Sequence, residues 1–312
     1  MACHYSIHGL ILSLPFPCDL LEAAPASGAV DVTVREGEVP AALENAAFCD
    51  HDVDVALTAF LLRGGARSAR FLVENGSTIT VRKAAGCDDA LFFHHLLYPV
   101  IAALLRQRGL LVFHASAAVL GGRAVLVAGD SGAGKSTAIA GLMTRGWIVQ
   151  SDDVSAVSIS PPGGIAVLPG TAHIHLDETA TAGLALDTKD LPRRDWHRMK
   201  MAVPAAVAGQ RAALPLRRLV WLSRTEGGLD ISRVEGRAKL PFLLHALYGP
   251  LLPEQIAGRS ATLARLLADI ELLVIARPGS GWTADAVIDA IADEAPAPIG
   301  AAGVSAISRL SA

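Results

Sequence analysis

The sequence is short of the residues that mark disulfide-stabilised, metal-clustered or membrane-spanning proteins. Its 312 residues include only four cysteines, which lie far apart and form no Cys-x-x-Cys pair. This spacing argues against a zinc knuckle and against a disulfide framework, so we expect buried free thiols. The longest apolar stretches, 96–105 and 110–120, are too short or too interrupted by charge to cross a bilayer.

An excess of charge of one sign is also absent. The chain has 27 Lys and Arg against 30 Asp and Glu, a formal net charge of −3, and the arginines are scattered. No basic surface for nucleic acid is therefore expected. Residues 1–21 have no basic segment ahead of an apolar core and are broken by prolines, unlike a secretory signal. We expect a cytoplasmic protein with no nucleic-acid partner and no membrane association.

The hydrophobic fraction of 52% is enough for a sizeable core. Short apolar runs at 7–14, 30–34 and 71–81, the last turning at Asn75-Gly76, predict a β-rich N-terminal subdomain over residues 1–88. Apolar residues at helical spacing over 90–108, preceded by two aspartates and followed by Gly109, predict a bridging helix within 89–109. A catalytic α/β domain over 110–296 and a flexible tail over 297–312 complete the expected organisation.

A glycine-rich segment lies between a predicted strand, 124–128, and a predicted helix, 135–145. It reads Gly-Asp-Ser-Gly-Ala-Gly-Lys-Ser and matches the P-loop pattern, whose backbone N–H groups cradle phosphates. Lys135 is expected to reach the β- and γ-phosphates and to be exposed when no phosphate is bound, while Ser136 is expected to hold Mg²⁺. The expected nucleotide-binding residues are Gly129, Asp130, Ser131, Gly132, Ala133, Gly134, Lys135, Ser136 and Thr137.

Two adjacent acids, Asp152 and Asp153, end the strand predicted at 147–150, directly after the P-loop helix. In a parallel arrangement this strand lies beside the strand that enters the P-loop, and both carboxylates face the γ-phosphate. One carboxylate can organise Mg²⁺ and the other can take the proton of an attacking hydroxyl. The alternative is that the pair only forms a turn.

Three histidines have open interpretations. His114 lies within a strand predicted over 110–120, where a catalytic role and a satisfied core position are both compatible with the sequence. His173 and His175 fall on one face of a short strand, but no third metal ligand stands at a suitable spacing.

A basic cluster follows in a stretch of weak periodicity. It is either a loop that closes on phosphate or a solvated surface. Its residues are Arg193, Arg194, Arg198 and Lys200.

The order of His114, the P-loop at 129–137 and Ser151-Asp152-Asp153-Val154 resembles the catalytic core of the HPr kinase/phosphorylase family. The resemblance implies an α/β P-loop kinase core of the type shared with phosphoenolpyruvate carboxykinase. It also implies that Asp152 is the base on a substrate serine, that Asp153 and Ser136 hold the metal, and that His114 lies beside the reacting groups with Lys135.

The likeness is closer to a shorter branch of HPr-kinase-like proteins that phosphorylate the C-terminal serine of lasso-peptide precursors. This implies a serine kinase that uses ATP and Mg²⁺ and acts on a serine-containing peptide or small protein. A small-molecule kinase and a nucleotide-dependent switch or assembly ATPase are the alternatives. Homo-oligomerisation is left open.

Overall fold

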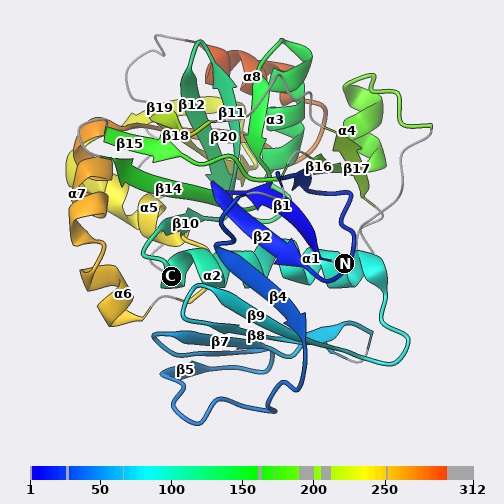
Figure 1. Cartoon of the computed structure of the whole chain (residues 1–312). Helices are drawn as coiled ribbons and strands as arrows, with labels where there is room; N and C mark the ends of the chain where they lie inside the picture. The colour runs from blue at the N-terminus through cyan, green and yellow to red at the C-terminus, as the bar shows by residue number, and fades with distance from the viewer. Residues whose placement is uncertain are drawn as a thin grey trace.

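The fold is a mixed α/β arrangement of three β-sheets with helices packed on them (Figure 1). The computed structural model describes residues 2–25, 28–65, 67–160, 164–171, 173–189, 200–204, 212–250 and 252–293. No helix in these ranges has the length and apolar character needed to cross a membrane. The two large sheets come from successive parts of the chain, 3–83 and 111–278.

The first sheet has nine strands in the order β3-β1-β2-β4-β9-β8-β7-β6-β5. β4 pairs with β2 and with β9 in parallel, and the other neighbours are antiparallel. Alternate residues of β2 and β8 are buried, as expected for strands with one face on a core. The strands are β1 (Cys3–Ile7), β2 (Leu10–Leu14), β3 (Glu22–Ala23), β4 (Val32–Glu36), β5 (Phe48–Cys49), β6 (Val53–Val55), β7 (Ala59–Leu62), β8 (Ala69–Glu74) and β9 (Thr78–Lys83).

Two tight turns shape this sheet. Asn75 and Gly76 have φ values of 53° and 62°, so the hairpin predicted between β8 and β9 is confirmed. A second hairpin turns at His8-Gly9, where φ is 51° and 74°, so the apolar run at 7–14 holds the last residue of β1 and all of β2.

The expected bridging helix is present and lies between the two large sheets (Figure 1). Its N-terminus is capped by Asp88, whose Oδ1 accepts a hydrogen bond from the Leu91 amide at 3.0 Å. Pro99 has no N–H to donate to the preceding turn, and a π-helical turn is found around it. The helix consists of α1 (Asp89–His95), the π-helical turn (Leu96–Val100) and α2 (Ile101–Gln107).

The second sheet follows the order β10-β14-β15-β18-β12-β11-β13, and β20 and β19 extend it from β18. β18 is parallel to both β12 and β20, so the carboxyl ends of these three strands meet at one edge. The strands are β10 (Leu111–Phe113), β11 (Ala115–Leu120), β12 (Arg123–Gly129), β13 (Ile148–Ser151), β14 (Ser155–Ser160), β15 (Gly164–Val167), β18 (Leu214–Thr225), β19 (Asp230–Val234) and β20 (Glu271–Pro278).

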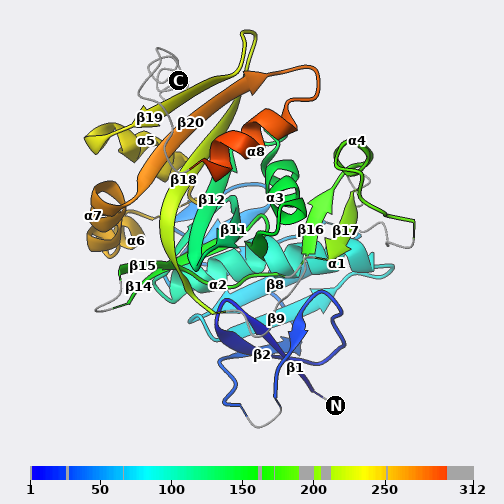
Figure 2. The same ribbon diagram turned by 90° about the horizontal axis from the view of Figure 1, so that it is seen from above.

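Helices cover both faces of the second sheet (Figure 2). Side chains on one face of β12, such as Leu126, pack with α5 and α7, and those on the other face, such as Val127, pack with α3 and α8. A third, two-stranded sheet is formed by β16 (His173–Leu176) and β17 (Met201–Pro204). The helices are α3 (Lys135–Thr144), α4 (Glu178–Gly183), a short 3₁₀ turn (Gly236–Lys239), α5 (Leu240–His245), α6 (Pro253–Ala257), α7 (Ser260–Asp269) and α8 (Ala284–Ala292).

Two sequence predictions about this sheet are wrong. The strand predicted over 110–120 is interrupted at His114, and its halves β10 and β11 belong to distant positions in the strand order. Because a single residue joins them, the sheet must curl so that these positions approach each other. The strand before Asp152, β13, pairs with β11 rather than with β12. β12 and β13 still run in the same direction, since each is antiparallel to β11.

Candidate functional site

The glycine-rich loop joins the end of β12 to the start of α3, where the sequence places it. Gly129 has a φ of 141°, and a Cβ there would lie 2.1 Å from the carbonyl oxygen of Leu222 on β18. Gly134 has a φ of 105° immediately before the first residue of α3. Both positions require glycine, because a side chain would be strained and at Gly129 would also collide with the backbone.

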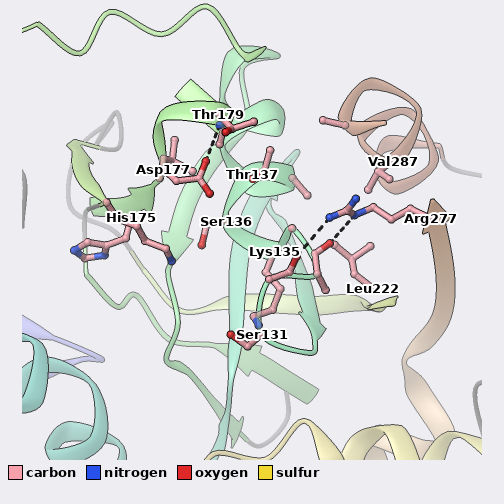
Figure 3. A pocket seen from close by; sticks show the side chains of 18 of the residues that line it. Ser131, Lys135, Ser136, Thr137, His175, Asp177, Thr179, Leu222, Arg277 and Val287 are labelled. Atoms are coloured by element: carbon pink, nitrogen blue, oxygen red, sulfur yellow. Dashed lines mark hydrogen bonds between the residues drawn. The ribbon is translucent and has the colours of Figure 1, made fainter. Parts of the chain in front are cut away.

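Two arginines hold the outside of this loop. Arg277, near the end of β20, donates from Nε to the Ala133 carbonyl at 2.7 Å (Figure 3). Arg224, near the end of β18, donates from Nη2 to the Gly132 carbonyl at 2.5 Å. The sequence analysis missed both residues because they lie far along the chain from the loop. The available signal was their position at the carboxyl ends of apolar strands, which in open α/β sheets face the binding crevice.

Lys135 is buried rather than exposed, which corrects the sequence-based expectation. Its Nζ donates to the carbonyl oxygens of Gly129 at 2.9 Å and Asp130 at 3.2 Å. Burial lowers the pKa of Lys135, and the nearby charges of Asp153 and Asp152 act in the opposite direction. The ammonium group therefore lies inside the loop, where bound phosphates would compete with the two carbonyls for it.

Asp152 is fully buried directly behind the loop and is held by three donors. Its Oδ1 accepts from the hydroxyls of Ser116 at 2.6 Å and Ser136 at 3.1 Å, and its Oδ2 accepts from the backbone amide of His175 at 2.9 Å. Burial alone would raise the pKa of Asp152, but the interactions with His175 and Ser116 outweigh it and lower the pKa to about 2. Asp152 is thus an ionised group that positions the hydroxyl of Ser136.

Asp153 points in a different direction from Asp152 and lines the cavity. Its φ is 60°, in the left-handed region, and its side chain is 24% exposed. Its Oδ1 lies 3.8 Å from Nε2 of His114. Burial and the negative charge of Asp152 raise the pKa of Asp153, so this carboxylate holds a proton more readily than its neighbour.

His114 occupies the break between β10 and β11 instead of the middle of a strand. Its backbone amide donates to the Ala246 carbonyl at 2.7 Å, and its ring stacks on Tyr248 with centroids 5.4 Å apart. The side chain is 47% exposed, so it is not a buried core histidine. The imidazole therefore faces the cavity beside Asp153.

These groups surround one cavity of about 600 Å³, a size typical of small-ligand sites. The predicted residues that line it include loop positions 131–137, His114 and Asp153, whereas Gly129, Asp130 and Asp152 do not line it. Asp130 is instead 3.7 Å from the His245 imidazole. The structure therefore brings together the predicted loop, the acidic pair and His114.

Further lining residues were not singled out from the sequence as site residues. Tyr98 of the bridging helix hydrogen-bonds through its hydroxyl to Nδ1 of His175 at 3.0 Å, and its ring lies 5.0 Å from that of His94. All three contribute to the cavity wall together with Tyr248. Tyr98 and His94 reach the cavity through packing of the bridging helix against the C-terminal half of the chain, to which His175 and Tyr248 belong.

Metal ligation by histidine was not favoured by the sequence, and His175 instead contacts Tyr98 and Asp152. Among the residues that the structure describes, no cluster of three or more His, Cys, Asp or Glu side chains could hold a metal ion by itself. Lys200 lines the cavity. The other members of the basic cluster, 193, 194 and 198, and the predicted tail at 297–312 lie outside the described residues.

The chain was compared with protein-family models, with curated proteins and with solved structures. No family model matches the chain, and no curated protein matches it. Among the solved structures that match is the Hpr(Ser) kinase/phosphatase from Coxiella burnetii, at 16% sequence identity, covering 58% of this chain and 87% of that chain with a TM-score of 0.29.

Proposed function

We propose that this protein is an ATP-dependent kinase that transfers the γ-phosphate to a serine hydroxyl of a peptide or small protein. The observation that carries the proposal is the hydrogen bond between Ser136 and Asp152, with Asp153 exposed to the cavity beside it. This hydrogen bond joins the glycine loop to the acidic pair, of which Asp153 lines the cavity. Phosphoryl transfer needs this combination of phosphate cradle, metal-side oxygens and a carboxylate near the attacking hydroxyl.

The loop supplies the phosphate site in this proposal. Glycines at the N-terminus of α3 allow the backbone to approach an anion closely, and the positive end of the helix dipole favours negative charge there. Lys135 exchanges the carbonyls of Gly129 and Asp130 for phosphate oxygens. Arg224 and Arg277 keep the loop in place from outside through its carbonyl groups.

The donor set fits Mg²⁺. This ion prefers oxygen ligands and commonly uses one or two carboxylates together with substrate phosphates, so a complete protein cage is not required. Ser136 and Asp152 offer a hydroxyl and an ionised carboxylate 3.1 Å apart, and these two residues would hold the ion in our proposal. When bound, Mg²⁺ neutralises charge on the phosphates.

The sequence resemblance assigns the base to Asp152 and the metal to Asp153, and those roles stay predictions. The positions of the two side chains favour the reverse. Asp152 already accepts three hydrogen bonds, and its lowered pKa makes it a weak proton acceptor. Asp153 lines the cavity, and its raised pKa makes it the better proton acceptor of the two.

In the proposed step Asp153 accepts the hydroxyl proton of the substrate serine. The serine oxygen forms a bond to the γ-phosphorus, and the bond from that phosphorus to the oxygen bridging the β-phosphate breaks, which releases ADP. His114, 3.8 Å from Asp153, orients the carboxylate and can share its proton. Lys135 balances negative charge at the transferred group.

The acceptor approaches from the side of His114, which is 47% exposed at the cavity wall. Because His114 and Asp153 can be reached from solvent, the site can accept a serine carried on a flexible peptide. The sequence resemblance points to the C-terminal serine of a lasso-peptide precursor as such an acceptor.

Mass spectrometry of a serine-terminated peptide incubated with the protein, ATP and Mg²⁺ tests the proposal. We expect one added phosphate on the terminal serine and none on a matched peptide ending in alanine. ATP hydrolysis with no phosphopeptide would contradict a peptide kinase and favour a nucleotide-dependent switch or assembly ATPase.

A further inference from the structure

The cavity has a second wall that the phosphoryl-transfer chemistry does not use. It follows the end of β20 and enters α8, and it consists of Gly279, Gly281, Trp282, Thr283, Ala284 and Val287. This wall carries no ionisable side chain. It adjoins the glycine loop, because Arg277, just before this wall on the chain, donates to the Ala133 carbonyl at 2.7 Å. α8 also packs on α3, where a Cβ at Gly141 would lie 2.0 Å from Cδ1 of Ile288.

Trp282 is a preorganised aromatic surface within this wall. Its indole Nε1 donates to Oδ2 of Asp285 at 3.1 Å, which fixes the orientation of the ring. Its six-membered ring rests against Gly183 at the end of α4, where a Cβ would lie 2.3 Å from Cη2. Yet 43% of the residue is exposed, an unusual state for a tryptophan held on two sides.

The position of the γ-phosphate decides which part of a bound nucleotide lies against this wall. Asp153 and His114 define where the γ-phosphate reacts in the proposed function, and His175 belongs to the same side of the cavity. Figure 3 shows His175 on one side of Ser136 and Lys135, and Val287 on the other. With the γ end at Asp153, we place the nucleoside toward the opposite wall, which Val287 and Trp282 line.

We infer that Trp282 forms the base subsite of the nucleotide, with a purine ring stacked on the exposed part of the indole. This inference rests on the proposed function, since it takes the γ end from the acidic pair. The chemistry of the wall suits it: an aromatic ring and small residues that leave room, with the Asp285 carboxylate bonded only to the ring edge at Nε1. Base stacking on an aromatic side chain is tolerant of base identity, so ATP and GTP are both accommodated.

The experiment compares Mg-ATP with Mg-tripolyphosphate, which has the phosphates but no base, by calorimetric titration of Trp282→Ala, Trp282→Phe and the wild type. Loss of a base–aromatic stack corresponds to roughly a 5- to 150-fold weaker affinity. We expect Trp282→Ala to weaken ATP binding by that factor and tripolyphosphate binding by less than about twofold. Trp282→Phe keeps an aromatic face and restores most of the ATP affinity.

Phe48→Ala is the matched control, because Phe48 is an exposed aromatic residue of β5 outside the cavity, and it should leave both affinities unchanged. Equal losses for ATP and tripolyphosphate in Trp282→Ala would overturn the base subsite, and so would an unchanged ATP affinity. A wild type that binds neither compound would instead refute the phosphate site of the proposed function.

Discussion

Replacing each aspartate of the acidic pair by asparagine separates their roles. In Asp152→Asn one carboxylate oxygen becomes an NH₂ group, while the buried site still presents two hydroxyls and the His175 amide. If the remaining oxygen faces Ser116 and Ser136, the His175 N–H is left without its acceptor, at a cost of roughly 1–3 kcal/mol. We expect a lower free energy of unfolding because of this unpaired N–H, and weaker Mg-ATP binding because the neutral amide lacks the negative charge that holds Mg²⁺ in our proposal.

Asp153→Asn should behave differently. Asparagine tolerates the φ of 60° at this position, and burial beside the charge of Asp152 already disfavours the ionised form. A carboxyl whose folded pKa lies above its unfolded value destabilises the fold at neutral pH, so removing its charge should leave stability unchanged or higher. Loss of a general base lowers transfer by about 10²- to 10⁴-fold, and Mg-ATP binding should persist.

Three measurements on both variants decide the assignment: urea unfolding, Mg-ATP titration, and phosphate incorporation into a serine-terminated peptide by mass spectrometry. The reasoning is refuted if Asp153→Asn transfers phosphate at a near-normal rate. It is equally refuted if Asp152→Asn keeps the stability and nucleotide affinity of the wild type and loses only transfer.

Two further predictions concern stability. In Gly129→Ala the new side chain has a φ of 141° and collides with the Leu222 carbonyl, whereas in Gly122→Ala it has a φ of 75° and lies in open space. Urea unfolding should therefore show a loss of stability at Gly129 that exceeds the about 1–3 kcal/mol of backbone strain. Equal losses at the two glycines would contradict the clash. Burial raises the pKa of Asp54, but Arg63 at 2.7 Å and the Leu43 amide at 2.9 Å outweigh it and lower the pKa below 3.8. The ionised Asp54 therefore stabilises the fold by about 2 kcal/mol at neutral pH, and this stabilisation is lost as the pH falls through the folded pKa. The stability of Asp54→Asn should depend less on acid pH than that of the wild type. An identical dependence would show that the Asp54–Arg63 ion pair does not cause the loss of stability in acid.

The parts of the site that the sequence predicts well are local. The loop and α3 depend on glycine at defined positions and on a helix that begins at Lys135, and both signals lie within a few residues. The Asn75-Gly76 hairpin is confirmed for the same reason, since its positive φ values suit these two residue types. Such features need no knowledge of the rest of the chain.

The parts that the sequence does not predict depend on distant segments or on one backbone angle. Arg224 and Arg277 reach the loop from strands about 90 and 140 residues away along the chain. The adjacent acids look equivalent in the sequence, but the φ of 60° at Asp153 turns its side chain into the cavity while Asp152 stays buried. The His175 amide of β16 and the Ser116 hydroxyl of β11, both distant in the sequence, hold Asp152 in its buried position.

The central claim is that the glycine loop binds a nucleoside triphosphate through Lys135. Calorimetric titration of Mg-ATP into the wild type, Lys135→Ala and the control Lys189→Ala measures it directly, because Lys189 is an exposed lysine outside the cavity. A lost charge-assisted bond to phosphate corresponds to a roughly 10- to 150-fold weaker affinity. We predict that loss for Lys135→Ala and wild-type affinity for Lys189→Ala. Wild-type affinity in Lys135→Ala, with the fold intact by circular dichroism, would contradict the account.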